Sequence, residues 1–315
     1  MNDSVALRQA YGEALLKLGK ERSDFLVLDA DLSGGTMTDI FASKFPERFF
    51  DFGIAEENMM SAAAGMSTTG LIPIVNTYAV FVLRATEQIR NSIALPRFNV
   101  KIVASHAGLD LGQDGASHQA VEDLAVMRSI PNMVVMVPAD GIEIREMLIV
   151  ALDYKGPVYI RGARSPIPKI HNGGYHYQIG KADLLQDGCD VTIVAIGVMV
   201  HRALQAYRKL KHEGISSRIL NCSTLKPIDK EILIESASQT GAIVTVEDHN
   251  VIGGLGGAVA EVLAKRKPVP LEMVGIKDSF GESGEAEELF EKYGLGINDI
   301  VKAAKEVIRR KREFK

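Results

Sequence analysis

Short apolar runs alternate with segments of helical periodicity along this chain of 315 residues. Runs without polar alternation predict strands buried on both faces, and intervening helices allow neighbouring strands to pair in parallel. The pattern therefore predicts an α/β fold with helices on both faces of each sheet. The predicted strands are 25–28, 71–75, 100–104, 134–137 and 158–161, then 191–196, 218–221, 242–246 and 271–274; apolar residues at Leu7, Ala10, Tyr11, Ala14, Leu15 and Leu18 predict an opening helix.

The alternation breaks between Ser165 and Gln178, where prolines and the triplet Asn172-Gly-Gly interrupt any periodicity. Such clusters of turn-forming residues are typical of linkers. The length of the chain also favours two domains over one. We therefore expect two doubly wound domains, one over 1–165 and a smaller one over 181–315, joined by a linker over 166–180.

Composition narrows the class of protein. A hydrophobic fraction of 46% with 24% charged residues is typical of a globular protein in water. The formal net charge of −4 offers no general basic surface for nucleic acid, and no apolar stretch is long enough to span a bilayer. The two cysteines, Cys189 and Cys222, form neither a disulfide framework nor a metal cluster. We expect a cytoplasmic protein that binds neither nucleic acid nor membranes.

Polar residues stand where the predicted strands end. In an open parallel sheet, ligands bind beyond the carboxyl ends of the strands; Glu56, Asn76, His106 and Arg161 all fall at such ends. Glu56 follows a strand predicted over 49–54 and begins a helix, whose free N–H groups stabilise negative charge. An acidic first turn is also common on surface helices, so this position alone does not establish a site.

Three motifs follow one another in a specific order and spacing: Ile54-Ala-Glu56, Asn76-Thr-Tyr78-Ala-Val-Phe81-Val-Leu-Arg84, and a segment from His106 to His118 that contains Gln113-Asp114-Gly. Together they resemble the pyrimidine-binding domain of transketolases and their thiamine diphosphate-dependent relatives. The resemblance extends through nearly the whole chain and includes a transketolase carboxy-terminal domain. It implies an enzyme that uses thiamine diphosphate.

By this resemblance, Glu56 protonates the aminopyrimidine ring of the cofactor, which then removes the proton of its own thiazolium carbon. Phe81 stacks on that ring and Tyr78 lines the pocket. The two aromatic residues lie three apart, so we expect them on one face of a helix. Asp31 matches a family residue near the cofactor and the dimer interface. Arg84 either orients a carboxylate or packs against its neighbours, and both interpretations stay open.

The segment from His106 to His118 carries the substrate groups that the resemblance implies. His106 and His118 hydrogen-bond the carbonyl and hydroxyls of a ketose and stabilise the alkoxide formed during the reaction, while Asp114 reads a hydroxyl that distinguishes sugar donors. We expect the glycine-rich stretch 108–115 to be a flexible loop. The same residue types would suit a metal, but their spacing lacks the close pairs of zinc sites, so we assign this chain no metal ligands.

Three arginines are candidates for the phosphate of a sugar, because a guanidinium group matches phosphate oxygens bidentately. Arg161 and Arg164 both stand at the end of the strand predicted over 158–161. The resemblance favours Arg161, although either could serve. Arg8, in the first helix, resembles a second phosphate contact of the family.

A glycine-rich segment of the second domain, 253–257, follows a predicted strand and precedes a helix. Its spacing is not that of the G-x-G-x-x-G dinucleotide fingerprint. Together with Glu247-Asp-His249, it resembles a structural or interfacial pattern of the transketolase carboxy-terminal domain. We assign it no catalysis.

The Gly-Asp-Gly motif that holds magnesium and the diphosphate in complete transketolases does not occur in the sequence. Binding the diphosphate therefore requires a separate subunit that supplies the magnesium site. The resemblance then implies a split transketolase: a dimer of this chain, in a two-plus-two complex with that subunit, moves two-carbon ketol units between sugar phosphates. The alternatives are a 2-oxo-acid dehydrogenase beta subunit, a deoxyxylulose-phosphate synthase-like enzyme and an inactive scaffolding subunit.

Overall fold

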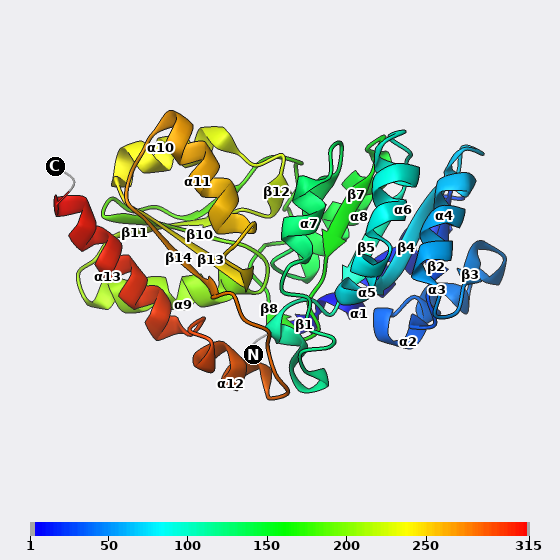
Figure 1. Cartoon of the computed structure of the whole chain (residues 1–315), viewed down its shortest axis with the longest axis horizontal. Coiled ribbons are helices and arrows are strands. Elements are labelled where there is room, and N and C mark those ends of the chain that lie inside the picture. The colour runs from blue at the N-terminus through cyan, green and yellow to red at the C-terminus, as the bar shows by residue number, and fades with distance from the viewer. Residues whose placement is uncertain (1–3, 314–315) are drawn as a thin grey trace.

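The computed structural model describes residues 4–313, whose larger sheet has seven strands (Figure 1). These strands are β2 (Phe25–Asp29), β3 (Phe49–Asp51), β4 (Ile72–Tyr78), β5 (Lys101–Ser105), β6 (Val134–Met136), β7 (Val158–Arg161) and β12 (Thr224–Lys226). Their order is β12-β6-β7-β5-β4-β2-β3, and only the edge strand β12 runs antiparallel to its neighbour. The predicted α/β fold with a parallel sheet is confirmed.

The second sheet has five strands in the order β14-β13-β10-β11-β9, with β9 antiparallel at one edge. Its strands are β9 (Asp183–Gln186), β10 (Val191–Ala195), β11 (Ser217–Asn221), β13 (Ile243–Asn250) and β14 (Leu271–Ile276). A separate antiparallel pair joins β1 (Ser4–Ala6) to β8 (Pro166–Pro168). The sequence did not predict β1, β8, β9 and β12, because three or four residues at a sheet edge carry too short a pattern and prolines are tolerated there.

Helices cover both faces of the larger sheet. Those of this half are α1 (Leu7–Glu21), α2 (Ser33–Thr36), α3 (Asp39–Ala42), α4 (Glu56–Ser67), α5 (Ala79–Arg84), α6 (Thr86–Gln88), α7 (Asp123–Ser129) and α8 (Gly141–Asp153), with short helices η1 (Pro46–Arg48), η2 (Ile89–Ala94) and η3 (Leu109–Asp114). One apolar core lies under α1 and α8, and another lies under α4, η2 and α7. All six apolar positions that predicted the opening helix are buried in α1.

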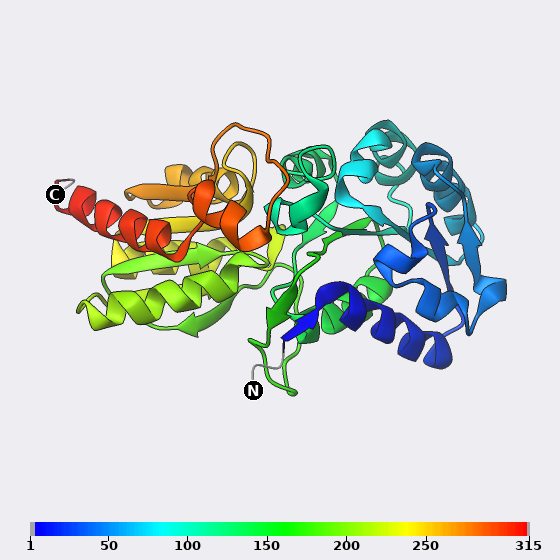
Figure 2. The same cartoon turned by 90° about the horizontal axis from the view of Figure 1, so that it is seen from below.

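The helices of the second half are α9 (Met199–His212), α10 (Lys230–Thr240), α11 (Leu255–Arg266), α12 (Ala286–Lys292) and α13 (Ile297–Glu313). Helices α9 and α13 cover one face of the five-stranded sheet, and α10 and α11 cover the other (Figures 1 and 2). The core under α10 and α11 is continuous with the core under α4 and α7. The two halves therefore share buried apolar surface, which disfavours free movement between them.

The junction between the halves is more ordered than a simple linker. Within the predicted linker, β8 pairs with β1, and the buried Tyr177 hydrogen-bonds Thr224. Strand β12, which belongs to the second half by sequence, extends the sheet of the first half through β6. The division into 1–165, 166–180 and 181–315 consequently stays a proposal.

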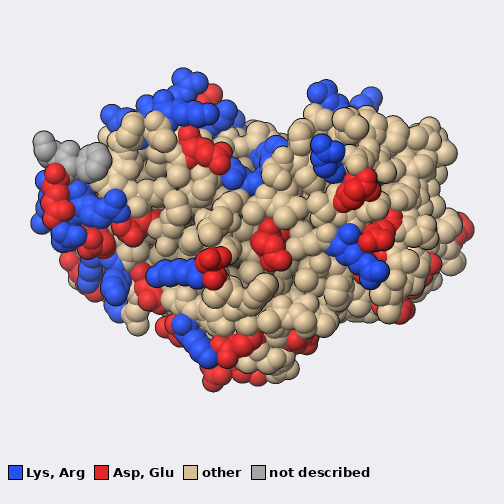
Figure 3. Space-filling view, viewed as in Figure 1, with Lys and Arg blue, Asp and Glu red and all other residues tan. Residues whose placement is uncertain are grey.

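Within residues 4–313, no helix is both long enough and apolar enough to cross a bilayer. On the face that Figure 3 shows, charged side chains of both signs are denser over the second half, and the first half carries smaller groups of both signs. Exposed apolar side chains of the first half include Ile54 and Leu95.

Candidate active site

The carboxyl ends of the parallel strands β7, β5, β4, β2 and β3 lie along one edge of the larger sheet. The register pairs Tyr78 of β4 with Ser105 of β5, so His106 leaves the sheet beside Tyr78. Asn76 lies inside β4, where it bonds the Tyr11 hydroxyl and two backbone carbonyls, and we assign it no role in the site. The predicted site residues that follow this edge, in strand order, are Arg161, His106, Tyr78, Asp31 and Glu56.

Glu56 is the first residue of α4 and is 3% exposed. Its Oε2 atom is buried and has no hydrogen-bond partner among the described residues. A buried acceptor without a donor costs free energy, so such an atom needs a partner from outside the protein, such as a water molecule, an ion or a ligand. The next residue, Glu57, is exposed and pairs with Arg84 at 3.6 Å. Glu56 therefore offers a free oxygen to a donor group, and Arg84 has a surface partner.

Aromatic rings of Tyr78 and Phe81 stack with centroids 5.8 Å apart and planes inclined by 11°. The prediction that both lie on one helix is wrong, because Tyr78 still pairs with β5 and ends β4, while Phe81 lies in α5. Tyr78 also stacks on His106 at 3.9 Å, and the edge of His118 meets Phe81 at 5.4 Å. The four rings form a continuous row, which we call the aromatic row.

His106 is buried in a left-handed backbone conformation with φ of +58°. A residue other than glycine is rarely held there, and such strain is found most often at functional sites. Its Nδ1 lies 2.8 Å from the Ser105 hydroxyl. Burial, assisted by the positive charges of Arg8 and Arg164, lowers the pKa of His106 to about 3. The imidazole is therefore neutral near pH 7 and acts through hydrogen bonds rather than charge.

The stretch 108–115 is not a flexible loop, contrary to the prediction. It forms η3, two short 3₁₀ turns joined by a kink at Gly112, in which Leu109, Asp110, Leu111 and Gly112 are buried. The carboxylate of Asp248, from β13, accepts hydrogen bonds from the backbone N–H groups of Leu109 and Asp110, at 2.9 and 3.1 Å. Nothing in the spacing of the sequence pointed to this contact; the only signal was the pattern Glu247-Asp-His249. Asp114, at the end of η3, remains accessible.

The side chain of Arg161 is buried and paired within the protein. Its Nε lies 2.9 Å from Asp123 of α7, and its Nη2 donates to the carbonyl oxygens of Ala120 and Asp248. These contacts correct the preference for Arg161 as the phosphate ligand, because its donors are turned toward internal acceptors. Asp123 lies in α7, a different element from Arg161, and no motif of the sequence pointed to it.

Arg164 and Arg8 face a common hollow of about 240 Å³, lined also by Gly112 and Gln113. The Arg164 side chain is 35% exposed and lies 3.9 Å from Asp114, while its Nη1 donates to the Leu111 carbonyl. The Nε of Arg8 is buried and has no hydrogen-bond partner in the described part of the chain. Two acids, Asp110 and Glu285, also line this hollow. Asp110 accepts hydrogen bonds from the backbone N–H groups of Arg164 and Ser165, and Glu285 accepts one from Gln113, so the two guanidinium groups still offer donors to an anion.

Asp31 lies beyond the end of β2 and takes a left-handed conformation with φ of +61°. Its backbone N–H donates to Asp51, at the end of β3, over 3.0 Å. Its side chain is exposed at the same edge of the sheet as Glu56. Asp31 is thus available to a ligand or to a neighbouring subunit.

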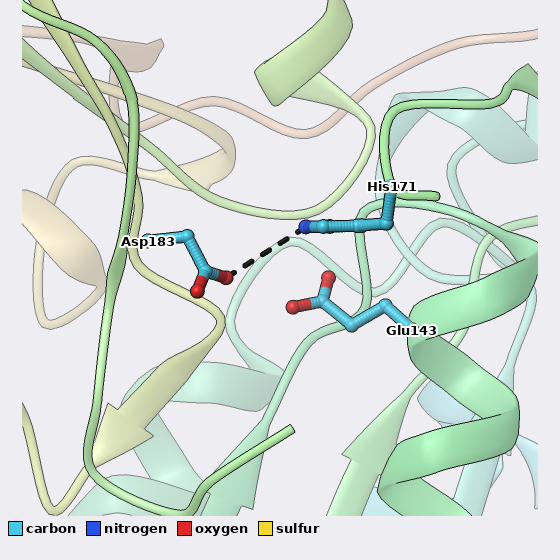
Figure 4. Close-up of side chains that lie close together, drawn as sticks. All are labelled: Glu143, His171 and Asp183. Atoms are coloured by element: carbon cyan, nitrogen blue, oxygen red, sulfur yellow. Dashed lines mark ion pairs between the residues drawn. The ribbon is translucent and has the colours of Figure 1, made fainter. Parts of the chain in front are cut away.

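A second group of titratable side chains lies at the junction of the two halves. Glu143 of α8, His171 and Asp183 of β9 place potential ligand atoms within 4.8 Å of one another, and His171 points toward Asp183 (Figure 4). The Tyr175 hydroxyl already lies between the two carboxylates, 2.9 Å from each. The Nδ1 of His171 also lies 3.2 Å from Asp140, an ion-pair contact rather than a well-directed hydrogen bond.

The charge on His171 distinguishes an ion-pair network from a metal site. Burial would lower the pKa of this imidazole, but the carboxylates of Asp140, Asp183 and Glu143 outweigh burial and raise it to about 10. The imidazolium then supplies the positive charge that these carboxylates need. We interpret the group as an ion-pair network that joins the halves, and we assign it no metal.

Two family profiles match the chain: the transketolase pyrimidine-binding domain over residues 3–169, and the transketolase C-terminal domain over residues 180–300. The chain is similar to a putative transketolase C-terminal section of Methanocaldococcus jannaschii, with 48% identity over 96% of each chain. It is also similar to a 6-deoxy-6-sulfo-D-fructose transketolase subunit of a Clostridium strain, with 42% identity over 97% of this chain and 95% of that one.

A solved structure described as a split-gene transketolase, an inactive β4 tetramer, is similar to this chain over its whole length. The two share 52% identity and a TM-score of 0.91, over 97% of this chain and 99% of the other. Both halves of the fold are therefore found together in a known protein.

The burial of Arg161 predicts how stability responds to its removal. Replacing Arg161 with Met leaves the Asp123 carboxylate buried without its cation, which should lower the free energy of unfolding by about 3–5 kcal/mol. Arg164→Met, at a partly exposed side chain, should cost about 1 kcal/mol or less. Urea unfolding at one protein concentration measures both. Equal losses would contradict the assignment of Arg161 to the interior.

The raised pKa of His171 predicts how stability depends on pH. Its stabilising effect is fully present below the unfolded pKa of about 6.5 and is lost as pH rises toward the folded value of about 10. The difference in unfolding free energy between the native chain and His171→Gln should therefore shrink from pH 6 to pH 9.5, by on the order of 4 kcal/mol. A difference independent of pH would contradict the ion-pair network.

Proposed function

This chain belongs to the transketolase family, and on that basis we propose that it is the pyrimidine-binding subunit of a split transketolase. In this proposal it acts in the cytoplasm with a separate subunit that holds magnesium and the diphosphate of thiamine diphosphate. The complex transfers a two-carbon ketol unit from a ketose phosphate to an aldose phosphate. Relatives that match over nearly their whole length are named as transketolase sections or subunits, which favours this reaction over the dehydrogenase and synthase alternatives.

The unpaired Oε2 of Glu56 is the observation that carries the proposal. Members of the family depend on thiamine diphosphate, whose thiazolium carbon supplies the nucleophile when the cofactor is bound. Glu56 fits the role of holding and passing the proton at the pyrimidine ring, because its buried oxygen has no donor within residues 4–313. Phe81 and Tyr78 offer stacked ring faces for the same pyrimidine, and Asp31 lies on the same edge of the sheet.

The sugar would lie along the aromatic row. His106, neutral and fixed by Ser105, hydrogen-bonds the carbonyl oxygen and the alkoxide that forms from it, with His118. The side chain of Asp114 is exposed enough to hydrogen-bond a hydroxyl group of the sugar. Arg164 and Arg8, rather than Arg161, would bind the phosphate in their shared hollow. The preferred sugar can differ between relatives, since one of them is named for a sulfonated ketose.

Self-association and a second subunit both fit the exposed surface near Glu56. Ile54, two residues before Glu56, and Leu95 are apolar and more than two-thirds exposed. Single exposed apolar side chains are normal on a protein surface, so the proposal of a partner rests mainly on the missing diphosphate motif and on the relatives named as sections or subunits. A two-plus-two complex would cover both side chains. We further propose that the isolated chain has no transketolase activity; the related tetramer of one chain type is itself described as inactive.

Reconstitution with the amino-terminal transketolase section of the same organism tests the function. The mixture, with magnesium and thiamine diphosphate, should accelerate hydrogen–deuterium exchange at the thiazolium carbon and transfer ketol units. Glu56→Gln should slow that exchange by roughly a hundredfold or more, since an amide cannot pass the proton. Glu57→Gln is the matched control and should behave as the native chain does. Native exchange rates in Glu56→Gln would refute the role of Glu56, and robust turnover by the chain alone would refute the split enzyme.

The hollow between Arg164 and Arg8 predicts a defect specific to phosphate. Hydrogen bonds to charged groups are worth roughly 1.5–3 kcal/mol, so Arg164→Met should raise KM for a ketose phosphate by about tenfold to a hundredfold. KM for hydroxypyruvate, which carries no phosphate, should change little. Arg164→Lys should fall between the two, because it keeps the charge without the planar fork. An equal change for both donors would place the phosphate elsewhere.

A further inference from the structure

Two neighbouring acids in β13, Glu247 and Asp248, are buried. Both are carboxylates, but they accept hydrogen bonds from different halves of the protein. Glu247 accepts hydrogen bonds from the backbone N–H groups of Leu255 and Gly256, at the start of α11 in its own half. Asp248 instead accepts two backbone N–H groups of η3, in the other half. One acid stabilises its own domain, and the other reaches into the candidate active site.

The contact between Asp248 and η3 is close. The backbone at Gly108 has φ of +74°, and a Cβ added there would lie 2.1 Å from the Asp248 carboxylate. Glycine therefore allows the chain to pass directly over the acid. A carboxylate that accepts two backbone N–H groups forms charge-assisted hydrogen bonds, which are stronger than neutral ones. Since 3₁₀-helices have poorer internal hydrogen bonds than α-helices, η3 depends on such external anchors.

A second carboxylate continues the connection from η3 to the predicted phosphate site. Asp110, held by Asp248 through its N–H group, accepts hydrogen bonds from the backbone N–H groups of Arg164 and Ser165, at 2.7 and 2.9 Å. The Arg164 side chain in turn donates to the Leu111 carbonyl of η3. The position of Arg164 thus depends on the first turn of η3, whereas Asp114 lies beyond the kink at Gly112.

We propose that Asp248 is a positioning residue through which the carboxy-terminal domain sets the position of Arg164, the predicted phosphate ligand. Its carboxylate touches neither substrate nor cofactor and acts by fixing the first turn of η3, to which the backbone and the side chain of Arg164 are hydrogen-bonded. The inference rests on the proposed function, and it gives the second domain a role in substrate binding. Because Asp248 and η3 belong to different domains, a shift of one domain relative to the other would displace the site.

Asp248→Asn and Glu247→Gln form a matched pair for the test in the reconstituted complex. Each replaces a buried carboxylate with an amide, which keeps one acceptor and turns an NH₂ group toward a backbone donor. Asp248→Asn should raise KM for a ketose phosphate roughly tenfold, with smaller changes in kcat and in KM for hydroxypyruvate. Glu247→Gln should leave the KM values unchanged. Equal changes of KM in the two variants would contradict the proposal and would show that Asp248 has only a general structural role.

Hydrogen exchange of backbone amides in the chain itself provides a readout that does not need activity. Asp248→Asn should speed exchange within 109–114 and at 164–165 but not at 255–256, and Glu247→Gln should do the reverse. Unchanged exchange within 109–114 in Asp248→Asn would overturn the proposal. If the complex lacks ketol transfer with every donor, the proposed function fails, while this exchange pattern still decides whether Asp248 holds η3.

Asp110→Asn is the second variant, should Asp248→Asn fail to fold. It breaks the connection one step nearer to Arg164. Exchange at 164–165 should then rise while the amides of Leu109 and Asp110 stay protected, and KM for the ketose phosphate should rise as in Asp248→Asn. Protection that is unchanged at 164–165 would contradict the connection from Asp248 to Arg164.

Discussion

The in-register pairing of the parallel strands β4, β5 and β7 is the constraint on which the candidate site depends. Tyr78 pairs with Ser105, and Ala104 pairs with Arg161, so three segments that are distant in the sequence leave the sheet side by side. A slip of one residue would turn every side chain of a strand to the opposite face. The aromatic row exists because this register brings Tyr78 and His106 together, with ring centroids 3.9 Å apart.

Buried charged side chains form a second set of contacts that holds the site in place, and several of them connect the two halves. Arg161 pairs with Asp123 and donates to the Asp248 carbonyl, while the Asp248 side chain holds η3. On the other side of the junction, His171 is surrounded by carboxylates from both halves. Removing one partner of a buried pair leaves an uncompensated charge, which costs several kcal/mol. These pairs, with the shared apolar core, couple the carboxy-terminal domain to the carboxyl edge of the larger sheet.

Much of the fold followed from periodicity, whereas several features of the site did not. The uninterrupted apolar runs predicted the parallel strands, because a strand buried on both faces must be apolar at every position. The position of Glu56 at a helix start was also predicted correctly. The glycines of 108–115 suggested flexibility, but glycine also permits close approach of backbones, and only the position of Asp248 decides between the two. Tyr78 lies in a strand rather than in the predicted helix, because it pairs with Ser105, a residue far along the chain.

The sequence by itself therefore determined the α/β architecture and the family, together with which side chains gather at the carboxyl edge, because local periodicity and motif order are properties of the chain. Tertiary structure alone decided which of those side chains remain free. Arg161 and Arg164 are three residues apart and chemically identical. Arg161 is buried because it pairs with Asp123, whereas Arg164 lies beside Arg8 at an open hollow. Availability to a ligand depends on burial and on partners from other elements, and no short segment of sequence encodes either.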